Sequence, residues 1–199
     1  MSDHNPDVEA APEKRRFRYF PEIRIVCRRT EALDEPAREA VVEVCVAAHG
    51  EEDFRNLFSY IRAGGHHFLA YEGEALVGHA VVTTRWLQPE GLPLLKTAYV
   101  DAVATLPQKQ GRGIGSMVMG ALAEEIGDAY EIGCLETERV SFYERVGWEV
   151  WRGKLAGRDG DSLIATPEQT GIMILRLPQT TPLDLDGLLT IERQPGRIW

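Results

Sequence analysis

The sequence predicts a single domain of mixed α/β class. Its 199 residues are enough for one compact domain and few for two. Hydrophobic residues make up 44% of the chain and charged residues 27%, an ordinary balance for a globular protein. Segments in which apolar side chains alternate every second residue are interleaved with segments in which they recur at helical spacing. No uninterrupted apolar run approaches the ~20 residues that a membrane-spanning helix needs.

The first half of the chain alternates predicted strands and helices. Glu22–Arg28 alternates charged and apolar side chains, which is typical of a half-buried strand. Asp34 is the expected N-cap of the first helix, because its carboxylate can accept hydrogen bonds from the free N–H groups there. In chain order we expect a tail over residues 1–20, a strand over 22–28, helices over 37–48 and 54–61, and strands over 67–71, 76–86 and 97–106.

The second half continues the alternation. Apolar positions from Ile114 to Leu122 follow helical spacing and predict an amphipathic helix. We further expect a strand over 131–135, a short helix over 140–146, and strands over 148–152 and 171–177 with a glycine- and aspartate-rich loop between them. The domain is expected to span residues 21–178, followed by a C-terminal tail over 179–199.

Charge and cysteine content narrow the class of partner. The chain has 22 basic and 31 acidic residues, a net charge of −9, which disfavours generic nucleic-acid binding and suits a cationic partner. Cys27, Cys45 and Cys134 are odd in number and widely spaced, so neither a disulfide framework nor a zinc ribbon is predicted. We expect a cytoplasmic protein with reduced thiols that binds neither nucleic acid nor membrane.

A glycine-rich turn, Gln110–Gly115, lies between a predicted strand and a predicted helix. It lacks the lysine of a Walker motif and the spacing of the dinucleotide-binding G-x-G-x-x-G motif. Its missing side chains let an anion approach the backbone, and the helix dipole favours negative charge there. Lys109 and Arg112 add positive charge, which favours a pyrophosphate as ligand. On these residues alone, a turn without a ligand is an equally good interpretation.

With its flanking segments, this turn resembles the acetyl-CoA motif of the GCN5-related N-acetyltransferase (GNAT) superfamily. Gln110–Gly115 matches that motif position by position, Val100–Thr105 resembles the family's fourth strand, and Phe142–Trp148 resembles its later helix-and-strand signature. The resemblance covers residues 22–177 and implies an α/β fold with a central, mostly antiparallel, splayed sheet flanked by helices. It also implies acetyl-CoA as co-substrate, held by Val103, Ala104, Thr105, Gln110, Gly111, Arg112, Gly113, Ile114 and Gly115.

A narrower resemblance is to the aminoglycoside 2′-N-acetyltransferases. It rests on Tyr99-Val100-Asp101, on Gly147-Trp148 followed by Trp151-Arg152-Gly153, and on a C-terminus that ends Pro195-Gly196-Arg197-Ile198-Trp199. In that subfamily a similar tail brings the carboxylate of a terminal tryptophan to the substrate. The tail over 179–199 is therefore expected to fold back towards the acceptor. The resemblance implies substrate contacts for Asp53, Asp101, Ala102, Glu136, Glu168, Arg197 and Trp199.

The chain departs from this subfamily at acidic positions. Phe58 and Arg197 stand where the subfamily has acidic residues, and a further acidic cluster becomes Glu168-Gln169-Thr170. A cation at Arg197 is expected to repel a polycation and to pair with a carboxylate. This favours kasugamycin, which combines a 2′-amine with a carboxyl-bearing group, over gentamicin or tobramycin. An Arg197 that points into water is the alternative.

Two residues are expected to carry the chemistry. Acetyl transfer to an amine needs a path for the amine proton and an acid near the departing thiolate. Asp101 is the expected base, directly or through a water, and Tyr143 the expected acid, since a phenol has a reference pKa of ~10. The alternatives are a salt bridge or solvent exposure for Asp101 and a packing role for Tyr143.

No metal site is predicted. Candidate ligands lack ligand spacing: His49, His66, His67, His79, Asp159 and Asp161. His66 and His67 alternate faces of a strand. Cys134 is not expected to be a nucleophile that forms an acetyl-enzyme intermediate, because it has no acidic or histidine partner beside it in the sequence, and a buried structural thiol is the better interpretation. Asp159 and Asp161 fit a solvated turn better than a calcium loop.

The leading hypothesis is acetyl-CoA-dependent acetylation of a small-molecule amine by direct transfer, namely the 2′-amine of an aminoglycoside-type antibiotic, giving resistance. One alternative is transfer to another small amine or to a protein amine. Another is a regulatory module that binds CoA without catalysis, against which Asp101 and Tyr143 both count. Members of this superfamily often dimerise, so a homodimer is one expected assembly.

Overall fold

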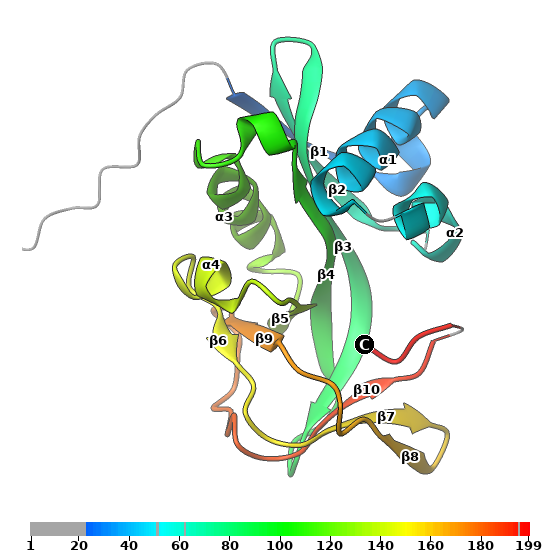
Figure 1. Ribbon diagram of the computed structural model, residues 1–199. Helices are drawn as coiled ribbons and strands as arrows, with labels where there is room; N and C mark the ends of the chain where they lie inside the picture. The colour runs from blue at the N-terminus through cyan, green and yellow to red at the C-terminus, as the bar shows by residue number, and fades with distance from the viewer. Residues whose placement is uncertain (1–22, 51, 62, 195) are drawn as a thin grey trace, which may run out of the picture.

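The computed structural model describes residues 23–50, 52–61, 63–194 and 196–199. The described residues form one ten-stranded sheet with helices on both faces (Figure 1). The elements are β1 (Ile23–Arg29), α1 (Glu35–His49), α2 (Leu57–Tyr60), β2 (His66–Glu72), β3 (Ala75–Pro89), β4 (Leu95–Thr105), α3 (Ile114–Ile126), β5 (Ile132–Glu136), α4 (Val140–Glu144), β6 (Glu149–Val150), β7 (Leu155–Asp159), β8 (Ser162–Ala165), β9 (Ile172–Arg176) and β10 (Leu189–Glu192). The expected N-terminal tail lies outside the described residues.

The long strand β3 organises the sheet. The strands follow the order β6-β9-β5-β4-β3-β10-β7-β8. Opposite β4, β3 pairs with β2 along its first half and with β10 at its end, and β1 pairs with β2. Among the described strands, only β4–β5 and β10–β7 are parallel pairs. The mostly antiparallel sheet expected from the sequence is thus confirmed.

β4 and β5 separate part of the way along β4. Their parallel pairing ends at Val100 and Leu135, whereas β4 continues to Thr105. The ladder between β3 and β4 shifts register at the same level. Ala102, in this part of β4, is the one described non-glycine residue with a positive φ, 50°. The splayed sheet is therefore present, and its open end lies along residues 101–105.

Helices cover the two faces of the sheet because apolar side chains of the strands alternate between them. On one face, α3 and α4 cover a core that includes Phe68 and Leu122. On the other face, α1 and α2 cover a core that includes Val41 and Leu69. A third core lies where β10 joins the sheet. In the described part of the chain, no helix combines the length and apolar character needed to cross a bilayer.

Local signals in the N-terminal half act as expected. Ile23, Ile25 and Cys27 of β1 all pack against the core on the α3 face. Asp34 caps α1, because its carboxylate accepts a hydrogen bond from the N–H of Ala37 at 3.0 Å.

Two C-terminal segments differ from the sequence prediction. The stretch expected to be a glycine- and aspartate-rich loop contains the β7–β8 hairpin, so that prediction is wrong. Its turn holds Gly160 at a φ of 59°, and an Asp-Gly pair between extended segments is a hairpin signal. Part of the expected tail is β10, which pairs with both β3 and β7 and buries Leu189 and Ile191. The tail therefore completes the sheet.

Candidate active site

The turn before α3 presents backbone N–H groups to an open space. Gly111 and Gly113 have φ angles of 74° and 82°, which residues with side chains rarely adopt. A β-carbon at either position meets no described atom within 4 Å. Gly113 is the N-cap of α3 and contributes no side-chain cap. The first N–H groups of the helix therefore remain available, together with the positive end of its dipole, as the binding of a pyrophosphate requires. We call the turn Gln110–Gly115 the cradle.

The cations beside this cradle already have an anionic partner. Lys109 Nζ and Arg112 Nη2 both contact the carboxylate of Glu72, the latter at 2.8 Å. The hydrogen bond from Lys109, followed by that from Arg112, holds the pKa of Glu72 below its usual range. The sequence pattern indicated the two cations but not Glu72, which reaches them from the end of β2. The side chain of Gln110 also has a partner within the protein, because its Nε2 donates to the carbonyl of Thr105 at 3.1 Å.

Some of the expected cofactor-binding residues can offer a side chain to the ligand, and others can offer only backbone atoms. Two of them are half-buried on the last part of β4: Val103 and Thr105. The side chains of Ala104 and Ile114 are buried in the cores on the two faces of the sheet, so only their backbone atoms can contact a ligand. A β-carbon at Gly115 would lie 3.3 Å from Cζ of Phe142, which places the start of α3 against α4.

Tyr143 lies in α4 with its ring buried. The ring packs edge-on against Phe142 and Trp148, at centroid distances of 4.9 and 6.1 Å. Burial raises the pKa of Tyr143 to about 12. The phenol is therefore protonated at neutral pH and can donate a hydrogen bond, while its ring also fulfils the packing role that was the alternative.

Asp101 and Arg197 form a two-pronged ion pair at the open end of β4. Nη1 and Nη2 of Arg197 donate to the two carboxylate oxygens at 3.0 and 2.7 Å. Burial alone would lower the pKa of Arg197, but the hydrogen bonds and charge of Asp101 outweigh burial and raise that pKa. Asp101 is thus in a salt bridge, one of its expected alternatives. The expectation of Arg197 as an unpaired cation is wrong, because its partner approaches from a distant strand.

A buried arginine that sequence analysis missed holds the C-terminus against β3. Arg85 is 0% exposed. Its Nη2 donates to the carbonyls of Glu192 and Ile198, the latter at 2.7 Å, and its Nε donates to the Glu192 carboxylate at 3.2 Å. The guanidinium groups of Arg85 and Arg197 lie 4.9 and 5.4 Å from the ring centroid of Tyr99. The available signal was an arginine in a strand that has no other lysine, arginine or acidic residue.

Trp199 does not offer its ring to a ligand. Trp199 is 5% exposed and belongs to the third core, together with Tyr99 and Leu189. Its indole Nε1 donates to Oγ1 of Thr166 at 3.0 Å. The ring is therefore not available to stack on a substrate, and it anchors the C-terminus inside the protein.

The other residues expected to contact the acceptor come from several segments. Glu136 ends β5, is exposed, and accepts a hydrogen bond from Nε2 of Gln169 at 2.6 Å. Glu168 is exposed on the loop after β8. Ala102 occupies the irregular part of β4. The side chain of Asp53 lies outside the described residues.

A group of possible metal ligands lies on the α3 side of β1 and β2. Atoms of Cys27, His66 and Glu125 all lie within 4.8 Å of one another, a grouping that sequence spacing did not predict. Nη1 of Arg29 lies 2.9 Å from Nε2 of His66. A guanidinium can only donate, so it occupies the lone pair of that nitrogen and adds positive charge where a cation would bind.

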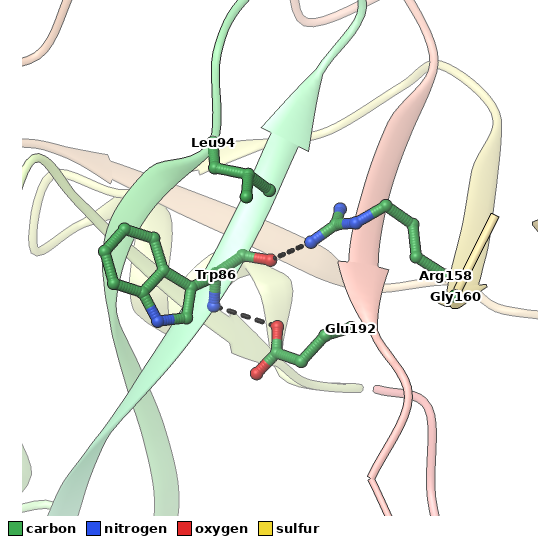
Figure 2. A pocket seen from close by; sticks show the side chains of 5 residues that line it. All are labelled: Trp86, Leu94, Arg158, Gly160 and Glu192. Carbon is green, nitrogen blue, oxygen red and sulfur yellow. Dashed lines mark hydrogen bonds between the residues drawn. The ribbon is translucent and has the colours of Figure 1, made fainter.

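A surface pocket lies at the far end of β3 from the cradle (Figure 2). It is lined by Trp86, Leu94, Arg158, Gly160 and Glu192. The pairing of β10 with β3 begins after Trp86, so side chains meet the backbone of Trp86: its N–H donates to Glu192, and Arg158 donates to its carbonyl. This pocket therefore marks the junction of β3 and β10 and is separate from the cradle.

Comparison with known proteins identifies the family. Residues 63–150 match the model of the acetyltransferase (GNAT) domain. An aminoglycoside 2′-N-acetyltransferase of Mycolicibacterium fortuitum is 30% identical over 177 residues, which cover 85% of this chain and 89% of that protein. The chain belongs to the GNAT acetyltransferase family, and the resemblance stated from the sequence is confirmed. Acetyltransferase activity with acetyl-CoA, on a small-molecule or protein amine, follows from this membership.

Solved structures share the fold. The GNAT family N-acetyltransferase YhbS of Escherichia coli, crystallised in complex with CoA, gives a TM-score of 0.58 at 13% identity and covers 87% of this chain and 93% of its own. An acyl-CoA N-acyltransferase of Pseudomonas aeruginosa gives a TM-score of 0.55 at 13% identity, covering 77% of this chain and 99% of its own. These similarities establish the fold.

Proposed function

We propose that this acetyltransferase acetylates an aminoglycoside-type antibiotic at its 2′-amine and thereby gives resistance. The observation that carries the proposal is the 30% identity, over 85% of the chain, to an aminoglycoside 2′-N-acetyltransferase. The geometry supports it, because Asp101 and the C-terminal Arg197 meet on the strand that leads into the cradle. We place the reaction in the cytoplasm, where acetyl-CoA is available and the three free cysteines stay reduced.

Asp101 is proposed to orient the amine and take its proton. The amine lone pair forms the N–C bond while the carbonyl pair moves to oxygen, and the C–S bond then breaks as the carbonyl re-forms. The amine loses one proton in this exchange, and the CoA thiolate gains one. Arg197 uses one lone pair on each oxygen of Asp101, and each oxygen keeps another that can accept from the amine or from a bridging water.

Tyr143 is proposed to donate to the departing sulfur. A thiol with a reference pKa of ~8.5 is a stronger acid than a phenol. Since burial raises the pKa of Tyr143 to about 12, full proton transfer from its hydroxyl to the thiolate is uphill. Tyr143 therefore acts first as a hydrogen-bond donor that stabilises the thiolate while the C–S bond breaks.

The charge balance on the acceptor side favours an acceptor with few positive charges. Arg197 neutralises Asp101, and Arg85 neutralises Glu192. Gentamicin and tobramycin are polycations and find no unpaired carboxylate among these four residues. Kasugamycin carries a carboxyl-bearing group and fewer positive charges, so its binding depends less on an unpaired carboxylate in the protein. It remains the proposed acceptor, now because Asp101 is neutralised rather than because Arg197 is free.

The test is thiol release from acetyl-CoA with kasugamycin, gentamicin, tobramycin, spermidine and a lysine peptide, followed by NMR of the product. We expect acetylation of the 2′-amine of kasugamycin, with a kcat/KM about tenfold or more above the others. Turnover of only spermidine or the peptide would replace the antibiotic by another amine. Calorimetric binding of acetyl-CoA without thiol release for any acceptor would instead indicate a regulatory CoA-binding module.

A further inference from the structure

A buried pair of histidines lies beneath the irregular part of β4. His67 of β2 and His79 of β3 are both 0% exposed. Nδ1 of His67 lies 2.9 Å from Nε2 of His79. At one end of the pair, Nδ1 of His79 lies 2.9 Å from the carbonyl oxygen of Ala102. At the other end, Nε2 of His67 lies 3.1 Å from Oγ1 of Thr30. The four groups form one continuous hydrogen-bonded chain.

Only one arrangement of protons satisfies this chain with both imidazoles neutral. A carbonyl can only accept, so Nδ1 of His79 carries its proton and donates to Ala102. Nε2 of His79 then accepts from Nδ1–H of His67, and Nε2 of His67 accepts from the hydroxyl of Thr30. Oγ1 of Thr30 also lies 3.2 Å from the carbonyl of Gly65. That carbonyl already accepts the N–H of Thr30 at 2.9 Å, whereas Nε2 of His67 has no other donor in this chain, so we assign the hydroxyl hydrogen to His67.

The neutral state follows from the surroundings of the pair. Burial lowers the pKa of His67 to about 3 and that of His79 to about 4. Cys45 of α1 lies 3.6 Å from Nδ1 of His79, and burial raises the pKa of this thiol to about 12, so it adds no charge. Every donor in the chain therefore points towards Ala102, and hydrogen bonds aligned in this way polarise one another.

Ala102 is the residue whose backbone most needs support. A left-handed φ on a residue other than glycine is strained and persists only where the surroundings impose it. The described peptide bonds are trans, so the N–H of Val103 points opposite to the carbonyl of Ala102. Because His79 contacts α1, that N–H points away from α1 and from His79. The N–H of Val103 lies in the part of β4 that has already separated from β5.

We propose that His79 is a positioning residue for acetyl transfer: held by His67 and Thr30, its Nδ1–H fixes and polarises the Ala102–Val103 peptide so that the N–H of Val103 receives the thioester oxygen of acetyl-CoA. As the amine forms the N–C bond, the carbonyl pair moves to this oxygen and the polarised N–H stabilises the charge. The electron pair on oxygen then re-forms the carbonyl as the C–S bond breaks, and the negative charge leaves on the sulfur of CoA. The inference rests on the acetyltransferase activity and holds whichever amine is the acceptor.

Two substitutions at His79 separate positioning from packing. His79→Asn keeps an amide N–H near the place of Nδ1, whereas His79→Leu keeps bulk and removes the donor. Calorimetry with acetyl-CoA and with CoA needs no acceptor, so its result does not depend on the proposed antibiotic. We expect His79→Leu to reduce the preference for acetyl-CoA over CoA about tenfold, and kcat by a similar factor. His79→Asn should restore most of both, with CoA binding unchanged throughout.

The wild-type protein provides a second measurement that no folding defect can obscure. Heteronuclear NMR of the imidazole nitrogens at pH 7 should show both histidines neutral, with the proton on Nδ1. A proton on Nε2 of either ring would overturn the proposal. So would a ratio of acetyl-CoA to CoA affinity that stays within about twofold of wild type in His79→Leu. If His79→Leu does not fold, Thr30→Val replaces it as the test. Thr30→Val removes the hydroxyl that donates to His67 at the far end of the hydrogen-bonded chain from Ala102, and it should lower the ratio of acetyl-CoA to CoA affinity. An unchanged ratio would overturn the proposal.

Discussion

The cofactor side and the acceptor side of β4 are built in different ways. On the cofactor side, strand, glycine turn and helix follow one another along the chain, and backbone N–H groups face the open space. On the acceptor side, Asp101 meets Arg197 from 96 residues further on, and Arg85 meets Glu192 and Ile198. The proposed acceptor side is thus built from side-chain charges that are paired with one another.

This difference separates the control of the two substrates. The backbone geometry of the cradle depends on Gly111 and Gly113, whose φ angles are 74° and 82°. The charge pairs depend on β10, which brings the C-terminus back to β3. We therefore expect changes near the C-terminus to alter the choice of acceptor while the binding of acetyl-CoA stays the same.

Acid should destabilise the fold through the buried histidine pair. Unfolded histidine has a pKa of ~6.5, whereas burial lowers the pKa of His67 to about 3 and of His79 to about 4. Below pH ~6.5 the unfolded state binds more protons, so the free energy of unfolding falls as pH decreases towards 4, by up to ~1.4 kcal/mol per pH unit for each histidine. The ion pairs of Glu72, whose pKa is lowered from 4.5, should persist through that window.

Urea unfolding at pH 7, 6 and 5 measures this fall. A double variant, His67→Gln with His79→Asn, carries no imidazole in the pair and should show a much flatter dependence on pH over the same range. An equally steep fall in the double variant would mean that groups other than this pair titrate over the same range.

A side chain in the cradle should block the cofactor side alone. Asn tolerates the left-handed region better than other side chains, so Gly113→Asn keeps the turn and fills the open space. We expect the Kd of acetyl-CoA to rise roughly 100-fold, about 2.7 kcal/mol, by calorimetry. Gly160→Asn is the matched control, because Gly160 has a φ of 59° and no described atom within 4 Å of its β-carbon position. Unchanged affinity for acetyl-CoA in folded Gly113→Asn would show that this turn does not bind the pyrophosphate.

Removing one hydroxyl should slow the chemical step without touching either binding side. Tyr143→Phe keeps the packing against Phe142 and Trp148 and removes the donor. We expect kcat to fall roughly 10- to 100-fold while KM for acetyl-CoA and thermal stability stay close to wild type. Tyr130→Phe is the control, since that hydroxyl bonds to Thr84 at 3.0 Å near the start of β4. Wild-type turnover in Tyr143→Phe would leave Tyr143 with its packing role only.

Freeing Asp101 should change the acceptor and leave the cofactor unaffected. Arg197→Gln removes the cation paired with Asp101, so the ratio of kcat/KM for tobramycin to that for kasugamycin should rise about tenfold. Arg193→Gln is the control: Arg193 also follows β10, but it pairs with Asp159 at 2.7 Å on the exposed hairpin. Equal ratios in the two variants would show that the Asp101–Arg197 pair does not govern the choice of acceptor.

The sequence predicted what lies close together along the chain. The cap at Asp34, the turn before α3 and the alternation in β1 are local, so residue type and spacing were enough. Pairings between distant segments were not predictable in this way. Nothing in the sequence around Arg197 indicates that Asp101 is its partner. Apolar residues alternate only weakly from Leu155 to Asp159, so the pairing of β10 with this strand was not predicted either. Burial of Trp199 followed from that same unpredicted strand.

The smallest expected effect lies at the edge of the cradle. Glu72 holds both Lys109 and Arg112, so pyrophosphate has to compete with its carboxylate for these cations. Glu72→Gln should therefore tighten acetyl-CoA binding about two- to fivefold at low ionic strength, the size expected of exposed ion pairs. The gain should shrink as salt is added, because the cations are partly exposed and screened. Glu74→Gln removes the same charge two residues along the chain and should have less effect. Weaker binding in Glu72→Gln would show that Glu72 positions the two cations for the ligand instead of competing with it.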